Sequence, residues 1–255
     1  MNKIALRVLC AVFAAGMLVS GFFIVKNLIE TSKTEKLYEE LQNEFTKPVP
    51  PVIPQQTVGG GAITEDNALD IEVDFTALKK KNSEVVGWLY LPDTPLNYPV
   101  VQAQDNKKYL NRDISGKKLF AGTLFADFRC DAAGNDTNCV IYGHNMKNGT
   151  MFKTVTDYKK QSFYDEHSVL YYLTPDVSYK VEPILGLVVP DDDELYDLPT
   201  DGAEMLDYIS SKKWDSSFTS NTTYSAEDKF ITLSTCSKEF SNARFVIVGK
   251  LSEVE

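Results

Sequence analysis

Histidine and cysteine are both scarce in this chain of 255 residues. Only two histidines occur, His144 and His167, so any chemistry that needs an imidazole has two candidates. Four cysteines are too few for a small disulfide-dense scaffold, whose stability depends on several bridges. They are Cys10, Cys130, Cys139 and Cys236.

Positive charge is also in deficit, because 36 acidic residues outnumber 26 basic ones and give a formal net charge of −10. Nucleic-acid binding needs a basic surface that neutralises phosphates, so we expect no nucleic-acid partner. Internal repeats and cofactor motifs are absent from the sequence, and we expect a chemistry without a cofactor. The hydrophobic fraction of 43% is ordinary for one sizeable globular domain with appendages.

The sequence contains one long uncharged run, Val8–Val25, with 18 residues. As a helix at about 1.5 Å per residue it spans roughly 27 Å, close to the apolar thickness of a bilayer. A cleaved signal peptide has a shorter apolar core and a small-residue cleavage site, and neither feature is evident here. We therefore expect residues 1–30 to be an uncleaved membrane anchor, with the N-terminus inside the cell and the remaining chain outside.

Residues 31–69 are predicted to form a stalk and a spacer. The Ser-x-x-Glu sequence at Ser32 has the form of a capping box, and apolar residues recur every four positions at Leu37, Leu41 and Phe45. This pattern predicts a short helix that continues from the anchor, with a partner-binding helix as the alternative. The segment Pro48–Gly61 contains four prolines and three glycines, which indicates a spacer; a proline-rich docking motif is the alternative.

Residues 70–255 are predicted to form one mainly β domain. A helical turn is expected at Phe75–Lys81, followed by eight segments rich in β-branched or aromatic residues and bounded by turn formers. These predicted strands are Val85–Leu91, Pro99–Gln102, Leu119–Ala126, Val140–Gly143, Val169–Leu173, Tyr179–Val189, Phe230–Ser234 and Phe245–Leu251. Short strands in this number, with few helices, predict a closed or nearly closed β-barrel.

A long excursion, Pro190–Asp228, separates the sixth and seventh predicted strands. Within it, Ala203–Lys213 is predicted to be helical, with Leu206 and Ile209 on one side. The acidic run Asp191–Glu194 opens the excursion and is interpreted as a solvated loop, because it lacks the ligand spacing of a calcium-binding EF-hand.

Three residues of complementary chemistry lie at the ends of predicted strands. Cys236 follows the seventh strand, His144 follows the fourth, and Arg244 opens the eighth. A thiol reacts near neutral pH when a base or a cationic neighbour favours its thiolate. A guanidinium offers fixed donors to a developing oxyanion. Each residue also has an ordinary structural interpretation: a small buried hydrophobe, a structural histidine and a surface ion pair.

The segment Thr232–Cys236, TLSTC, followed by an arginine that opens the next strand, resembles the TLxTC…R signature of sortases. Asn97–Gln102 (NYPVVQ), Tyr142–Met146 (YGHNM) and the helix-bearing excursion resemble class B sortases in particular. The resemblance extends from Asp74 to Leu251. It implies an eight-stranded sortase-type β-barrel with N-terminal helices and a helix in the insertion between the sixth and seventh strands.

The resemblance also implies an activity. A cysteine thiolate attacks the threonine carbonyl of a C-terminal sorting motif and expels an amine, and an amino group of peptidoglycan or of a pilin lysine then resolves the acyl-enzyme. The expected substrates are surface proteins with a Pro-containing motif such as NPxTN, on a Gram-positive-type cell surface. The residues implied are, for catalysis, His144, Cys236 and Arg244 and, for substrate binding, Asn97, Tyr142 and Ser234.

Several alternatives stay open on the sequence alone. The activity is either transpeptidation or the hydrolysis of cell-wall peptides by a cysteine peptidase or amidase, and a non-catalytic membrane-tethered binding module would leave Cys236 buried and inert. Cys130 and Cys139 bracket a polar loop and either form a disulfide or, with His144, contribute to a metal site. Their spacing matches no compact zinc pattern, so we expect no metal. His167 lies in a polar turn and is interpreted as structural.

Overall fold

The computed structural model describes residues 3–49 and 69–254, and the chain forms two compact units, Met1–Glu40 and Leu41–Glu255. The predicted spacer lies, from residue 50 onward, outside the described residues, and its role as a spacer stays a prediction. The second unit begins well before residue 70, where sequence reasoning placed the start of the β domain.

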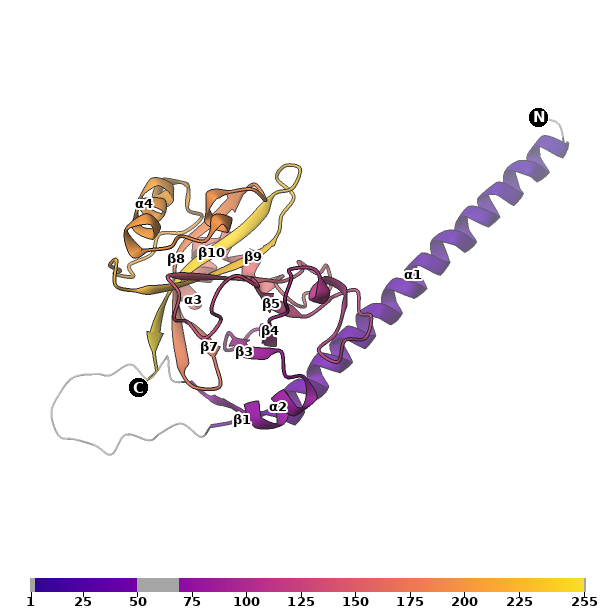
Figure 1. The fold of residues 1–255 in the computed structure, drawn as a ribbon. Helices are drawn as coiled ribbons and strands as arrows, with labels where there is room; N and C mark the ends of the chain where they lie inside the picture. The colour runs from indigo at the N-terminus through magenta and orange to yellow at the C-terminus, as the bar shows by residue number, and fades with distance from the viewer. Residues whose placement is uncertain (1–2, 50–68, 255) are drawn as a thin grey trace. The chain divides into compact units, whose positions relative to one another are not determined.

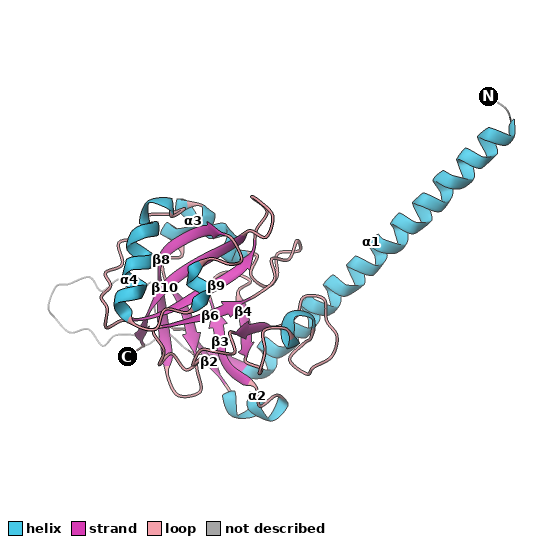
Figure 2. Ribbon diagram, turned by 45° about the horizontal axis from the view of Figure 1, so that its top comes forward, coloured by secondary structure: helices cyan, strands magenta, loops and turns pink. Residues whose placement is uncertain are grey.

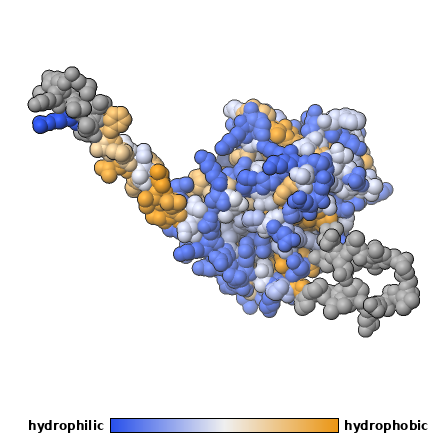
Figure 3. Space-filling view, turned by 180° about the vertical axis from the view of Figure 1, so that it is seen from behind, coloured by the Kyte–Doolittle hydropathy of each residue, from blue (hydrophilic) through white to orange (hydrophobic). Residues whose placement is uncertain are grey.

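α1, Lys3–Phe45, is a single helix that runs from the apolar segment through the predicted stalk. The stalk therefore continues the first helix as predicted, and the capping sequence at Ser32 starts no new one. In the first unit, described apolar side chains such as Phe13, Met17 and Phe22 are exposed, and Figure 3 shows the apolar surface that they form. The helix is long and apolar enough to cross a bilayer.

Eight strands of the second unit close into a barrel in the order β10-β8-β7-β3-β4-β5-β6-β9 (Figure 1). They are β3 Val85–Tyr90, β4 Asn97–Val101, β5 Leu124–Ala126, β6 Asn138–Tyr142, β7 Leu170–Leu173, β8 Ser178–Val189, β9 Lys229–Cys236 and β10 Arg244–Glu253. Each predicted strand has a counterpart, so the predicted barrel is confirmed. Two neighbouring pairs are parallel, β4 with β5 and β6 with β9, and the second pair positions the site described below.

Buried residues of the second unit lie on both faces of the barrel wall, because one cluster packs strand residues such as Phe230 against the helix Gly202–Lys212. Trp88, Tyr172, Phe230 and Phe245 come from four different strands, and each is at most 2% exposed. Burial of such a side chain stabilises a fold by about 1.5–3 kcal/mol. The strands that carry the site are therefore fixed in a well-packed wall.

Two helices of the second unit begin directly after an aspartate that caps their first turn. α2, Phe75–Lys81, begins after Asp74, whose carboxylate accepts a hydrogen bond from the Ala77 amide at 2.9 Å. α4, Gly202–Lys212, is capped in the same way by Asp201, matches the helix predicted in the excursion and lies beside β8 (Figure 2). The remaining short helices are α3 Gln161–Glu166, η1 Lys108–Asn111, η2 Thr154–Lys159, η3 Glu194–Asp197 and η4 Lys213–Asp215.

The third predicted strand is shorter than expected. β5 covers only the last part of Leu119–Ala126, because Gly122 adopts a φ of 61° in a turn closed by its N–H, which donates to the Leu119 carbonyl at 3.1 Å. The apolar residues before Gly122 therefore belong to this turn and not to the sheet.

The second unit starts at Leu41 because the last turn of α1 packs within it. Leu41 and Phe45 are buried, and the Gln42 side-chain amide donates to the Asn97 carbonyl at 2.7 Å. An additional antiparallel pair follows, β1 Thr46–Pro48 with β2 Ile71–Val73, which the sequence analysis did not predict.

Cys130 and Cys139 are joined in a disulfide. The bridge closes the polar loop before β6, and both cysteines are buried. Sulfur atoms in a disulfide are not thiolate ligands, so the metal interpretation built on these two cysteines is withdrawn.

Candidate active site

The hairpin of β9 and β10 places Cys236 opposite Arg244, because the two residues are register partners across this antiparallel pair. β9 is fixed in the barrel by buried apolar residues such as Phe230 and Leu233. Cys236 is the last residue of the strand and is a free, exposed cysteine. Its interpretation as a small buried hydrophobe therefore does not hold.

His144 reaches the same end of the barrel from β6. Because β6 and β9 are parallel neighbours, their chains leave the sheet on the same side. Beyond the paired residues, the Thr235 hydroxyl donates to the Gly143 carbonyl at 2.7 Å. Position 143 requires glycine, since a Cβ there would lie 2.5 Å from a Leu124 methyl carbon. This close approach fixes the backbone from which His144 projects.

The imidazole of His144 has one polar and one aromatic contact. Its Nε2 lies 2.7 Å from the Leu110 carbonyl oxygen, and its ring stacks on Phe120 with an interplanar angle of 5°. A carbonyl oxygen only accepts, so Nε2 carries the hydrogen and Nδ1 is left for proton transfer. The Leu110 carbonyl in turn lies beside Gly122, where a Cβ would come within 2.7 Å of it.

Arg244 has two acceptors at the turn end of the hairpin. Its Nη2 is 3.4 Å from the Asp191 carboxylate, and its Nη1 donates to the Ala243 carbonyl at 3.3 Å. The ion pair is partly solvated, since the two side chains are 29% and 41% exposed. Asp191 opens the acidic run that the sequence analysis interpreted as a solvated loop. Asp191, Asp192 and Glu194 are exposed, as that interpretation expects, and Asp191 in addition lines the site and pairs with Arg244.

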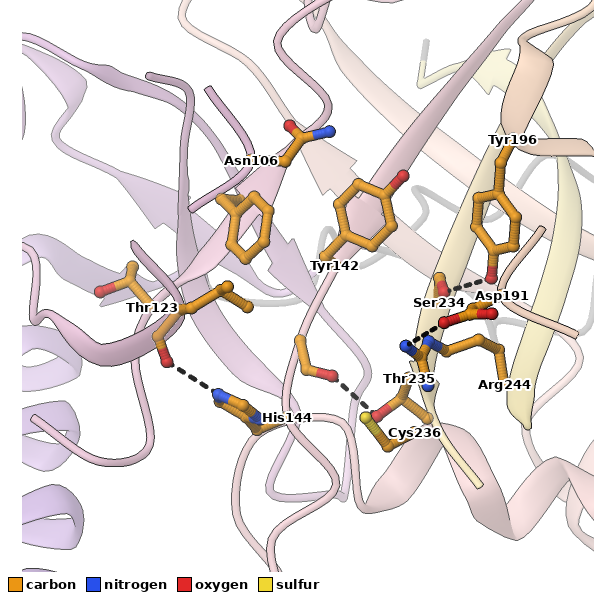
Figure 4. Close-up of a pocket in the computed structure, with 13 residues that line it drawn as sticks. Asn106, Thr123, Tyr142, His144, Asp191, Tyr196, Ser234, Thr235, Cys236 and Arg244 are labelled. Atoms are coloured by element: carbon orange, nitrogen blue, oxygen red, sulfur yellow. Dashed lines mark hydrogen bonds and ion pairs between the residues drawn. The ribbon is translucent and has the colours of Figure 1, made fainter. Parts of the chain in front are cut away.

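A cavity of about 310 Å³ unites these groups (Figure 4). Its lining consists of Asn106, Leu110, Thr123, Phe125, Tyr142, Gly143, His144, Asp191, Tyr196, Ser234, Thr235, Cys236 and Arg244. In Figure 4, His144 lies on one side, and Cys236 lies on the other side with Arg244. Of the residues singled out from the sequence, the structure thus brings together His144, Cys236, Arg244, Tyr142 and Ser234.

Asn97 is the exception, because the structure does not place it in the lining of this cavity, and its role in substrate binding stays a prediction. Its side-chain oxygen accepts a hydrogen bond from the Trp88 indole at 2.6 Å, and its carbonyl accepts one from Gln42. The side chain therefore serves the barrel wall and is not part of the cavity lining. A different asparagine, Asn106, lines the cavity instead.

Sequence reasoning also missed Tyr196, which lies in the excursion after β8. Its hydroxyl is 2.7 Å from the Ser234 Oγ, and its ring stacks on Tyr142 at 6.2 Å between centroids. Burial raises the pKa of Tyr196 to about 12, so the phenol is neutral at physiological pH. The sequence signal that could have identified Tyr196 is its position as an aromatic residue in a mainly acidic segment.

His167 lies outside the cavity, at the end of α3. Its backbone N–H donates to the Phe163 carbonyl at 2.9 Å, and its ring packs on the Phe163 ring at 4.4 Å between centroids. Its carbonyl accepts a hydrogen bond from the Tyr158 hydroxyl at 2.7 Å. These contacts agree with a structural role.

Comparison with known proteins identifies the family. The family model of the sortase domain matches residues 89–252 of this chain. The chain is 33% identical to sortase B of Listeria monocytogenes over 239 residues, which cover 92% of this chain and 91% of that protein. The chain belongs to the sortase family, class B.

Solved sortase structures agree with this membership. Sortase B of Bacillus anthracis in complex with AAEK1 has a TM-score of 0.72 and 29% identity, over 89% of this chain and 100% of that one. A Staphylococcus aureus sortase B–substrate complex has a TM-score of 0.66 and 31% identity, over 71% of this chain and 85% of that one. Sortases are cysteine transpeptidases that anchor surface proteins, so the resemblance found in the sequence is confirmed and the non-catalytic alternative is set aside.

Proposed function

We propose that this sortase cleaves a Pro-containing C-terminal sorting motif of surface proteins at Cys236 and transfers the acyl group to an amine. The observation that carries the proposal is the position of Cys236. It is a free, exposed thiol, a register partner of Arg244, and it lines a cavity together with His144. A nucleophile, a proton carrier and a cationic donor thus share one open space.

In the first half-reaction, the Cys236 thiolate attacks the threonine carbonyl of the sorting motif. Arg244 donates hydrogen bonds to the oxygen on which negative charge develops. His144, doubly protonated while the thiol is ionised, gives its Nδ1 proton to the departing amine, and Nε2 keeps its contact with the Leu110 carbonyl. The peptide C–N bond breaks and a C–S thioester bond forms.

In the second half-reaction, an amine attacks the thioester carbon. His144, now neutral, accepts the proton that the amine loses, and the C–S bond breaks as the new amide bond forms. The thiolate and the imidazolium are thereby restored. The acceptor is an amino group of peptidoglycan or of a pilin lysine, and the net reaction exchanges one amine for another.

The aromatic wall of the cavity supports a proline-containing substrate. The rings of Tyr142 and Tyr196 stack on one another, and Phe125 lies 5.2 Å from Tyr142 between ring centroids. Aromatic rings offer a large apolar surface against which a proline ring packs. Ser234 adds a hydroxyl that is already hydrogen-bonded to Tyr196.

We also propose that α1 anchors this sortase as a single-pass membrane protein, with the catalytic unit outside the cytoplasm of a Gram-positive-type cell. Residues 1–30 would form the anchor and residues 31–69 the stalk and spacer. The length of α1 and its exposed apolar side chains support the anchor. The disulfide between Cys130 and Cys139 supports an oxidising compartment.

Product analysis tests the reaction. The enzyme is incubated with a library of NPxTN peptides, with and without triglycine as the amine. We expect an amide-linked product that depends on triglycine and that is absent with Cys236→Ala. Free acid as the sole product at every triglycine concentration would instead support the hydrolytic alternative, and cleavage by Cys236→Ala would contradict the proposal.

A further inference from the structure

A buried carboxylate lies behind the wall of the cavity. Asp127 directly follows β5, its side chain is 0% exposed, and it is not one of the lining residues. Removing a charge from water in this way is costly unless several donors compensate it. The donors that surround Asp127 therefore indicate its role.

These donors come from three segments of the chain. Arg129 forms a bidentate pair with the carboxylate, with its Nε and its Nη2 each at 2.9 Å from one oxygen. The Asn106 amide donates at 2.8 Å and the Tyr142 hydroxyl at 3.0 Å. Burial raises the pKa of Asp127, but hydrogen bonds from Arg129, Asn106 and Tyr142 outweigh it and hold the pKa below its usual value.

The same network reaches the cavity at three points. Asn106 and Tyr142 line it directly, and the Arg129 Nη2 also donates to the carbonyl of the lining residue Tyr196 at 2.8 Å. In Figure 4 the Tyr142 hydroxyl points away from Cys236, on the side of the cavity where Asn106 lies. One carboxylate thus joins three segments that are distant in sequence into a single wall.

We propose that Asp127 is a positioning residue for the sorting peptide, which holds Asn106, Tyr142 and, through Arg129, Tyr196 in the arrangement that binds it. The assignment rests on the proposed function. Because Tyr142 donates its hydroxyl to Asp127, it presents its ring to the peptide. Among the described residues, the side-chain partners of the Asp127 carboxylate are two residues of this wall, Asn106 and Tyr142, and Arg129, which supports it. Loss of the carboxylate should therefore leave the groups proposed for catalysis in place.

The test is Asp127→Asn in the full chain in detergent, assayed with the NPxTN library. The amide keeps the shape of the side chain but removes the charge that pairs with Arg129. We expect the KM for cleavage to rise about tenfold with a smaller change in kcat, because a displaced wall binds the peptide poorly. Iodoacetamide alkylation of Cys236, followed by mass spectrometry of its tryptic peptide, should stay within about twofold of wild type.

Two further variants keep the test decisive if Asp127→Asn does not fold. Tyr142→Phe removes one donor to Asp127 and keeps the ring, and we expect the KM to rise by about threefold. Tyr172→Phe is the matched control, since it removes a hydroxyl that donates to the Ala132 carbonyl at 2.8 Å away from the cavity. Its KM should equal that of wild type.

Each outcome bears on the assignment. Parallel losses of kcat, alkylation rate and thermal midpoint in Asp127→Asn would show a merely structural role and overturn it, as would an unchanged KM in Tyr142→Phe. If wild type cleaves the peptides and the variants match it, only the positioning role fails. If wild type cleaves none of them, the proposed function fails as well.

Discussion

The two ends of the β6–β9 pair differ in the state of their cysteines. Near the start of β6, Cys139 is buried and bonded to Cys130. At the end of β9, Cys236 is a free and exposed thiol. Because the strands are parallel, their starts share one end of the barrel and their ends share the other. The position of a cysteine along these two strands therefore separates a disulfide-bonded sulfur from a free thiol, for which we propose the reactive role.

The loops at the two ends are also held differently. The disulfide closes the loop before β6 covalently. The loop after Cys236 is held by Lys159, whose ammonium lies 2.6 Å from the Ser237 hydroxyl and 2.5 Å from the Glu239 carboxylate. A partly exposed ion pair contributes less stability than a disulfide. The segment between Cys236, the proposed nucleophile, and Arg244 is thus fixed less firmly than the loop that the disulfide closes.

Removing the Cys236 thiol should have the largest effect on peptide turnover. We expect Cys236→Ala to lower peptide turnover by at least about 10⁴-fold, because Cys236 is the sole cysteine among the described residues that line the cavity, and without it the acyl-enzyme cannot form. Chromatography of the peptide products measures the loss. Acyl transfer retained by this variant would contradict the reactive role that distinguishes Cys236 from the disulfide-bonded cysteines.

His144→Ala is expected to lower turnover by about 10³-fold, because the departing amine then lacks its proton donor. The matched control is His167→Ala, whose ring packs on Phe163 outside the cavity and whose loss should leave turnover within about twofold. Thermal melts of both variants separate folding from catalysis. Equal losses of turnover with unchanged melts would mean that the histidines are misassigned.

Arg244→Lys is expected to lower turnover by about a hundredfold, because lysine keeps the charge but loses the planar fork that donates to the oxyanion. The alkylation rate of Cys236 should change much less. Paired pH profiles of alkylation and of peptide turnover provide the measurement. A shift of the alkylation profile as large as the loss of turnover would show that Arg244 acts mainly on the thiol.

At the other end of the β6–β9 pair, removing the disulfide between Cys130 and Cys139 should lower the stability of the fold and leave the activity unchanged. We expect the double variant Cys130→Ala/Cys139→Ala to lose about 2–3 kcal/mol in its free energy of unfolding, since the short loop is no longer closed in the unfolded chain. Urea denaturation measures this loss. Turnover reduced as far as in Cys236→Ala would contradict a purely stabilising bridge.

The smallest effect is expected at the Lys159 ion pair. The Lys159 hydrogen bond, followed by that of Ser237, lowers the pKa of Glu239 to about 2 from an ordinary 4.5. A carboxylate with a lowered pKa stabilises the fold above its ordinary pKa and loses this contribution as the pH falls toward the lowered value. Lys159→Met should therefore lower the thermal midpoint by about 1–3 °C at pH 7 and by less below about pH 4. An equal difference at both pH values would contradict this origin.

Local patterns were sufficient for the barrel strands, because each contains an apolar segment bounded by turn formers. Cys236, His144 and Arg244 were singled out by their places at strand ends, and the resemblance to sortases then implied catalytic roles, which stay a prediction. The lining residues depend on contacts between distant segments. Whether Asn97 faces the cavity is decided by Trp88 on the neighbouring strand, and Asp191 meets Arg244 across 53 positions. Neither contact leaves a local pattern in the sequence.

The three-residue strands β1 and β2 were missed for a related reason. Each is too short to show an alternating pattern, and their pairing joins Thr46–Pro48 to Ile71–Val73 across the spacer. The start of the second unit at Leu41 was missed as well, because the packing of the last turn of α1 depends on contacts such as that of Gln42 with the distant Asn97.

The most direct test of the central claim is the intact mass of the enzyme mixed with excess NPxTN peptide and no acceptor amine. We predict an adduct equal to the peptide fragment that ends at threonine, less one water, as a thioester requires. It should map to Cys236, be absent from Cys236→Ala and disappear when triglycine is added. An adduct on another residue, or cleavage of the peptide by Cys236→Ala, would contradict the account.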